Sequence, residues 1–92
     1  MEISRAEILA NGLVQGVGFR YFVIKNAQRL GLKGYTKNLY SGEVLTVAEG
    51  PRHLLEELYN IIRVGPAYAD VKNASIKWSD PKNEFTHFEI RY

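Results

Sequence analysis

The stretch Gly12-Leu13-Val14-Gln15-Gly16-Val17-Gly18-Phe19-Arg20 separates two differently patterned segments at the start of this chain of 92 residues. Residues 3–11 before it alternate apolar and polar side chains, as a half-buried strand does. Apolar side chains after it recur at helical spacing from about residue 19 to residue 30, and Gly31 follows where helices commonly end. The stretch is therefore predicted to link a strand, which Gly12 ends, to a helix.

The first predicted strand has one apolar face. Ala6, Ile8 and Ala10 fall on that face, whereas Arg5 and Glu7 fall on the opposite one. This alternation predicts a strand with a single face in the core.

The rest of the chain predicts five further elements. They are strands at 33–39 and 43–49, a helix opened by Gly50-Pro51 and stopped by Gly65-Pro66, and strands at 71–78 and 87–92. The short link Tyr40-Ser41-Gly42 favours a hairpin between the first two of these strands. Both faces of 43–49 are partly apolar, which suits an interior strand. Pro51 is expected in the first turn of the second helix, where its missing N–H costs nothing.

The order strand, helix, strand, strand, helix, strand predicts an α+β protein with the ferredoxin-like βαββαβ fold. Right-handed crossovers then give a two-layer sandwich, in which a mostly antiparallel sheet carries both helices on one face. The final strand is a short C-terminal addition. With 46% hydrophobic residues, we expect residues 1–92 to form a single domain.

Composition and charge exclude several classes of function. Cysteine is absent, which removes disulfides, thiolate zinc sites and a thiol nucleophile. No apolar run is long enough to span a bilayer, and the charged residues among the first ten are unlike a signal peptide, so a cytoplasmic protein without a membrane partner is expected. The net charge of +2 comes from dispersed residues and gives no indication of nucleic-acid binding.

The glycine-containing stretch has the chemistry of an anion-binding loop. A strand-to-helix connection directs backbone N–H groups and the positive end of the helix dipole at one point. Gly16 and Gly18 allow consecutive amides to turn inward, and Arg20 adds a planar fork that can grip two phosphoryl oxygens. The nucleotide P-loop does not fit, because no Gly-Lys-Ser/Thr follows. A structural turn before a helix also explains glycines at this spacing. The spacing alone therefore does not distinguish a turn from an anion-binding loop, and the longer motif around the glycines is needed.

The residues Val14-Gln15-Gly16-Val17-Gly18-Phe19-Arg20 resemble the first signature of the acylphosphatases. The resemblance continues through Gly34-Tyr35-Thr36-Lys37-Asn38-Leu39, Gly42, Ala48-Glu49-Gly50, Gly65-Pro66 and Phe88-Glu89-Ile90, and so covers essentially the whole chain. It implies a ferredoxin-like fold, a phosphate held by Arg20 and by the backbone amides of Gln15, Gly16, Val17, Gly18 and Phe19, and an attacking water oriented by Asn38. Two departures are Ser41, where many members have Asp, and Tyr35 in place of a frequent Trp.

Acyl phosphates suit a chain with few catalytic groups. Stable phosphate monoesters normally require metals, a covalent nucleophile or a general acid, and His53 and His87 lie far from the loop in sequence. An acyl phosphate instead releases a carboxylate of low basicity, which departs without protonation. We therefore expect a metal-independent hydrolase with no cofactor, acting as a monomer on a small-molecule acyl phosphate and releasing phosphate.

Two alternatives compete with the enzyme. One is a non-catalytic anion-binding or interaction module of the same fold. The other is an RNA-binding sheet of similar topology, which Val44–Ala48 disfavours because it lacks an aromatic pair resembling the RNA-stacking signature. Measured hydrolysis without salt-sensitive RNA binding separates all three.

Overall fold

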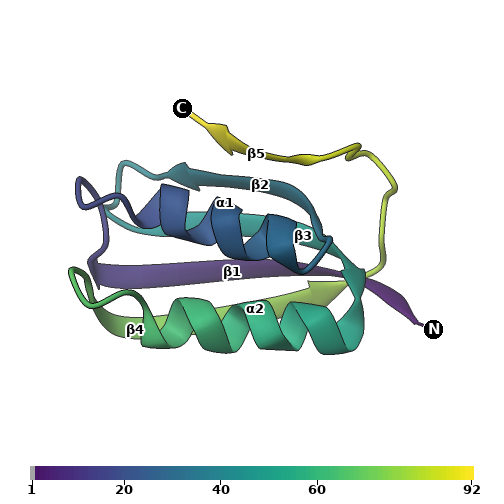
Figure 1. Cartoon of the computed structure of the whole chain (residues 1–92), viewed down its shortest axis with the longest axis horizontal. Helices are drawn as coiled ribbons and strands as arrows, with labels where there is room; N and C mark the ends of the chain where they lie inside the picture. Colours follow the sequence, from purple (N-terminus) through teal and green to yellow (C-terminus); the bar gives the residue numbers. More distant parts are fainter. Residues whose placement is uncertain (1) are drawn as a thin grey trace.

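A computed structural model describes residues 2–92, which form two helices and a five-stranded sheet (Figure 1). The elements are β1 (Ile3–Leu13), α1 (Phe19–Arg29), β2 (Lys33–Asn38), β3 (Val44–Pro51), α2 (Arg52–Val64), β4 (Asp70–Ser79) and β5 (Phe88–Arg91). Met1, the first residue of the predicted domain, lies outside the described residues. Neither helix of residues 2–92 is long and apolar enough to cross a bilayer.

The strands lie in the order β4-β1-β3-β2-β5. β1 pairs antiparallel with both β3 and β4, and β2 pairs antiparallel with β3. β5 pairs with the outer edge of β2 in parallel, as the short C-terminal addition. The predicted ferredoxin-like sandwich is confirmed, and β3 is the interior strand that its two apolar faces indicated.

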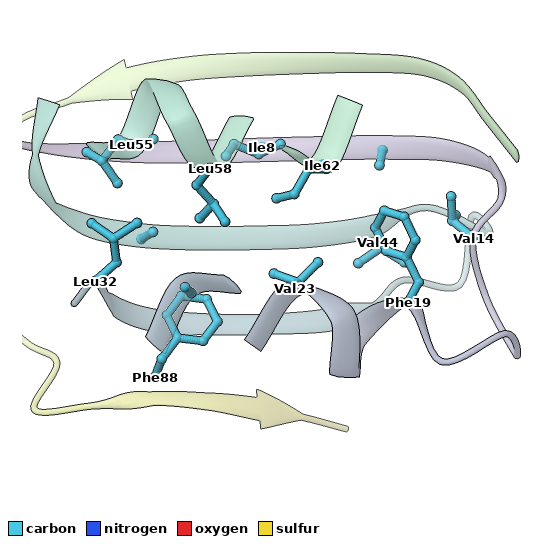
Figure 2. Packing of buried hydrophobic residues seen from close by; sticks show 14 residues of the cluster. Ile8, Val14, Phe19, Val23, Leu32, Val44, Leu55, Leu58, Ile62 and Phe88 are labelled. Carbon is cyan, nitrogen blue, oxygen red and sulfur yellow. The ribbon is translucent and has the colours of Figure 1, made fainter. Parts of the chain in front are cut away.

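Both helices cover the same face of the sheet, and the hydrophobic core fills the space between the layers (Figures 1 and 2). The alternation of β1 places Ala6, Ile8 and Ala10 there with at most 1% of each exposed. The helices contribute Phe19, Val23, Ala27, Leu55, Leu58 and Ile62. Full burial of one large aliphatic or aromatic side chain stabilises the fold by about 1.5–3 kcal/mol. Phe19 thereby anchors the first turn of α1 to the core.

Two predicted boundaries are wrong. β1 does not end at Gly12 but continues to Leu13, with a shift of its register against β4 after Asn11. Gly12 is required because a Cβ there would collide with the carbonyl oxygen of Asp70 on β4. Pro51 is the last residue of β3 rather than a first-turn residue of α2, because its ψ of 134° keeps the backbone extended.

A buried ion pair closes the end of the sheet that lies opposite the glycine loop. Arg5 and Glu49 are cross-strand partners, 6% and 7% exposed, and their side chains lie 2.8 Å apart. Arg5 also contacts Glu84 at 2.8 Å, and the backbone N–H groups of Lys82 and Asn83 donate to Glu49. Burial alone would raise the pKa of Glu49, but these hydrogen bonds hold it below its ordinary value. The connection from β4 to β5 is thereby fastened to β1 and β3.

Candidate active site

The loop between β1 and α1 has an open, glycine-shaped backbone. Gly16 and Gly18 adopt φ values of +75° and +76°, the left-handed region that other residues rarely enter. A Cβ at Gly16 would meet no atom of residues 2–92 within 4 Å, so conformation rather than crowding explains this glycine. Gly18 is the N-cap residue of α1, and no side chain of residues 2–92 caps the helix. Within the described part of the chain, the first N–H groups of α1 therefore have no side-chain acceptor.

Arg20 lies in the first turn of α1 and is partly exposed. Its Nη1 donates one long hydrogen bond of 3.3 Å to the carbonyl oxygen of Arg91, and its guanidinium carbon lies 4.8 Å from the ring centroid of Tyr92. The ion pairs found in residues 2–92 do not include Arg20. Most of its five N–H donors thus remain available to a ligand.

Asn38 is the last residue of β2, and its side chain is partly buried. Its Oδ1 is buried and has no hydrogen-bond partner within the described part of the chain. Buried polar atoms without a partner are rare, so each one calls for an explanation such as a ligand or a water molecule. Rotation about χ2 exchanges the oxygen and the NH2 group, so either end of the amide can face a ligand.

Two adjoining cavities bring these groups together. A cavity of about 290 Å³ is lined by Val14, Gly16, Gly18, Phe19, Arg20, Tyr21, Asn38, Ile90 and Tyr92. A second, of about 460 Å³, is lined by Gln15, Lys37, Asn38, Leu39, Tyr40 and Tyr92. Asn38 and Tyr92 belong to both. Of the seven predicted site residues, the first cavity joins Gly16, Gly18, Phe19, Arg20 and Asn38, whereas Gln15 lines the second. Val17 lines neither and packs against the hydrophobic core.

The sequence did not indicate the contribution of the C-terminal residues to the cavity wall. Ile90 and Tyr92 reach the site because β5 pairs in parallel with β2, whose end carries Asn38. The alternation of 87–92 predicts a strand but says nothing of its partner. Tyr21 lines the first cavity and Tyr40 the second, while Tyr35 packs against Phe85 and beneath the Arg91 guanidinium.

The two histidines lie outside both cavities. His53 is exposed on α2, and His87 contacts Thr86 and Glu89 near the start of β5. Among residues 2–92, no three acidic or histidine side chains group together as metal ligands would.

A glycine loop at a helix N-terminus, an arginine with free donors and an unpartnered asparagine converge on one cavity. They define a small ferredoxin-like domain with a candidate anion-binding site at one end of its sheet. The family model described as Acylphosphatase matches residues 6–90. The chain belongs to the acylphosphatase family.

Individual acylphosphatases match this chain over nearly its full length. The acylphosphatase of Moorella thermoacetica is 45% identical over 91 residues, which are 99% of this chain and 97% of that protein. The crystal structure of acylphosphatase from Bacillus subtilis is 34% identical, covers 99% of this chain and 100% of its own, and superposes with a TM-score of 0.92. An acylphosphatase structure from Coxiella burnetii is also 34% identical, covers 97% and 93%, and has a TM-score of 0.90. The predicted family and enzyme class, a hydrolase of acyl phosphates, are confirmed.

Proposed function

We propose that Arg20, Asn38 and the backbone N–H groups of residues 15–19 hydrolyse the carboxyl–phosphate bond, giving a carboxylate and inorganic phosphate. The observation that carries this proposal is the convergence of the glycine loop, Arg20 and Asn38 on one cavity of about 290 Å³. The reaction needs no protein acid, because an acyl phosphate releases a carboxylate of low basicity. Positioning and charge stabilisation are then the whole task of the site.

The loop and Arg20 hold the phosphoryl group in this mechanism. The uncapped N-terminus of α1 and the left-handed glycines favour inward-facing amides, which bind anionic oxygens. The guanidinium can take two oxygens in a bidentate contact once it leaves the carbonyl oxygen of Arg91. Charge spreads over the equatorial oxygens as the bond to the leaving group lengthens, so a donor here stabilises the transition state by roughly 3–4 kcal/mol.

Asn38 orients the attacking water. Its amide oxygen has no donor among residues 2–92 and can accept from the water, while the NH2 group can donate to a phosphoryl oxygen. An amide is not a base at neutral pH, so Asn38 contributes by holding the water in line with the leaving carboxylate. The water proton passes to a phosphoryl oxygen.

The test is release of phosphate from a simple acyl phosphate in the presence of a chelator. Asn38→Ala should lose turnover by roughly 10²-fold, the scale of a misplaced reactant, while circular dichroism shows an intact fold. Asn60→Ala, an exposed asparagine on α2, is the matched control and should retain full turnover. Unchanged hydrolysis in Asn38→Ala would refute the role of Asn38.

The second candidate is a non-catalytic anion-binding module of the same fold. It shares the loop and Arg20 but makes no use of the unpartnered Asn38 oxygen, which therefore favours the enzyme. Binding of phosphate without hydrolysis of any acyl phosphate would favour the module instead. The domain limits of 1–92, the monomeric state, the cytoplasmic location and the lack of a nucleic-acid partner stay predictions.

A further inference from the structure

The side chain of Gln15 joins the glycine loop to the hairpin between β2 and β3. Its Nε2 donates to the carbonyl oxygen of Leu39 at 2.8 Å and to that of Glu43 at 2.9 Å. Both amide hydrogens are therefore used. Two facing carbonyl oxygens also decide the orientation of the amide, because only its NH2 end can donate to them.

The two acceptors lie at the base of the hairpin: Leu39 directly follows Asn38, the last residue of β2, and Glu43 directly precedes β3. The backbone N–H of Leu39 donates to the same Glu43 carbonyl oxygen, and the N–H of Gly42 donates back to Leu39. The hairpin base is thus a small closed network of hydrogen bonds. Gln15 attaches this network to the loop across 24 and 28 residues of sequence.

The sheet itself does not connect the two halves of the site directly. The loop extends from β1 and Asn38 ends β2, but β3 lies between these two strands, so no ladder of hydrogen bonds joins β1 to β2. A direct link beside the cavities comes from the Gln15 side chain, which is half-buried.

We infer that Gln15 is a positioning residue, whose side chain sets the separation between the phosphate-binding loop and Asn38. The inference rests on the proposed function, in which the loop holds the phosphoryl group and Asn38 holds the water. Without the two hydrogen bonds, the loop can still bind an anion, but Asn38 no longer lies at the distance that in-line attack requires. Loss of the two hydrogen bonds should therefore lower kcat while leaving the affinity for an anion nearly unchanged.

The first test separates turnover from binding. Gln15→Ala should lower kcat by roughly 10- to 100-fold, since a misplacement of about 1 Å can cost 10²-fold, and should leave inhibition by inorganic phosphate nearly unchanged. Gln28→Ala, an exposed glutamine on α1, is the matched control and should keep the original kcat. Equal weakening of kcat and phosphate inhibition would mean that the loop itself had collapsed, which would overturn the inference.

A double-mutant cycle supplies the second test. If Gln15 acts through Asn38, adding Gln15→Ala to Asn38→Ala should not lower kcat further, whereas multiplied losses would overturn the positioning role alone. Full turnover in the single variant Asn38→Ala would instead refute the role of Asn38 in the proposed function.

Gln15→Glu keeps the shape of the side chain and guards against a folding defect in Gln15→Ala. Its ionised carboxylate would face two carbonyl oxygens, so kcat should fall at neutral pH and recover in acid, where the protonated group donates one hydrogen bond. A pH profile parallel to that of the original protein would contradict the inference.

Discussion

Arg5 and Arg20 lie toward opposite ends of the sheet and differ in what surrounds their guanidinium groups. Arg5 is buried, contacts two carboxylates at 2.8 Å and lies 5.2 Å from the Phe85 ring centroid. Arg20 is partly exposed and makes one hydrogen bond of 3.3 Å to a backbone carbonyl oxygen. Two carboxylates pair with the charge of Arg5, although its buried Nε has no hydrogen-bond partner among residues 2–92, whereas no carboxylate of these residues pairs with the charge of Arg20.

This difference shows how one small fold assigns stability and ligand binding to separate arginines. A buried cation that is paired resists change, because removing its partner leaves an uncompensated charge. A cation with spare donors beside a cavity can exchange a weak contact for a strong anionic one. The comparison predicts that substitutions at the Arg5 end alter unfolding and that substitutions at the Arg20 end alter turnover.

The largest effect is expected for Arg5→Ala. The free energy of unfolding should fall by about 3–5 kcal/mol, because Glu49 stays buried without its cation. Urea unfolding measures the change, and turnover of the molecules that remain folded should be unaffected. The double variant Arg5→Met, Glu49→Leu should recover much of the stability, since apolar residues can replace a buried pair. An unchanged unfolding curve for Arg5→Ala would contradict the stabilising role assigned to Arg5.

Arg20→Ala should show the opposite pattern. Turnover of an acyl phosphate should fall by roughly 10²–10³-fold, the cost of one lost transition-state donor, and inhibition by phosphate should weaken with it. The urea midpoint should barely move. Arg29→Ala, at the exposed last turn of α1, is the control for loss of a positive charge. Large destabilisation by Arg20→Ala would show that this arginine, too, serves the fold.

Gly16→Ala and Gly31→Ala form a matched pair. Both glycines have φ near +75° and open space where a Cβ would lie, so each substitution should cost about 1–2 kcal/mol of stability. Gly31 follows α1 at the end remote from the loop, and therefore only Gly16→Ala should also reduce phosphate inhibition and turnover. Equal activity in the two variants would remove the loop backbone from the mechanism.

The smallest effect concerns acid unfolding. Because the pKa of Glu49 is lower in the folded state, its contribution is complete above the ordinary value of 4.5 and is lost as the pH falls through the folded-state pKa. The stability of Glu49→Gln should therefore decline less steeply in acid. A hydrogen bond from Arg91 also lowers the pKa of Glu89, but Glu89 is more exposed, so Glu89→Gln should alter the acid limb less. Chemical unfolding at several pH values below 5 measures both.

Local sequence patterns predicted the helices and strands better than they predicted which other segments of the chain cover them. The alternation of β1 correctly placed Ala6, Ile8 and Ala10 in the core, because period 2 alone decides the face of a strand. The same alternation put Arg5 on the polar face, yet Arg5 is buried, because the connection from β4 to β5 covers it. That burial depends on a segment about eighty residues away in sequence, which no local pattern contains.

The residues of the candidate site show the same difference, because local chemistry indicated some of them and the position of others depends on distant segments. Glycines before a helix indicated the anion-binding loop from local chemistry, whereas the position of Asn38 beside it came from a resemblance. Ile90 and Tyr92 were missed, since strand alternation does not specify whether β5 joins β2 or β4. The side-chain bridge from Gln15 was missed as well, because the sequence assigned this residue only a backbone role.

The parallel pairing of β5 with β2 has a consequence for the order of folding. Val14 and Arg20 line one cavity together with Ile90 and Tyr92, so the walls of the site come from segments at least seventy residues apart in sequence. Such long-range contacts form slowly, because the intervening loop must first be closed at an entropic cost. A nascent or partly refolded chain can therefore contain much of its secondary structure before it can hydrolyse a substrate. The rate at which catalytic activity returns during refolding then reports the rate of the last folding step.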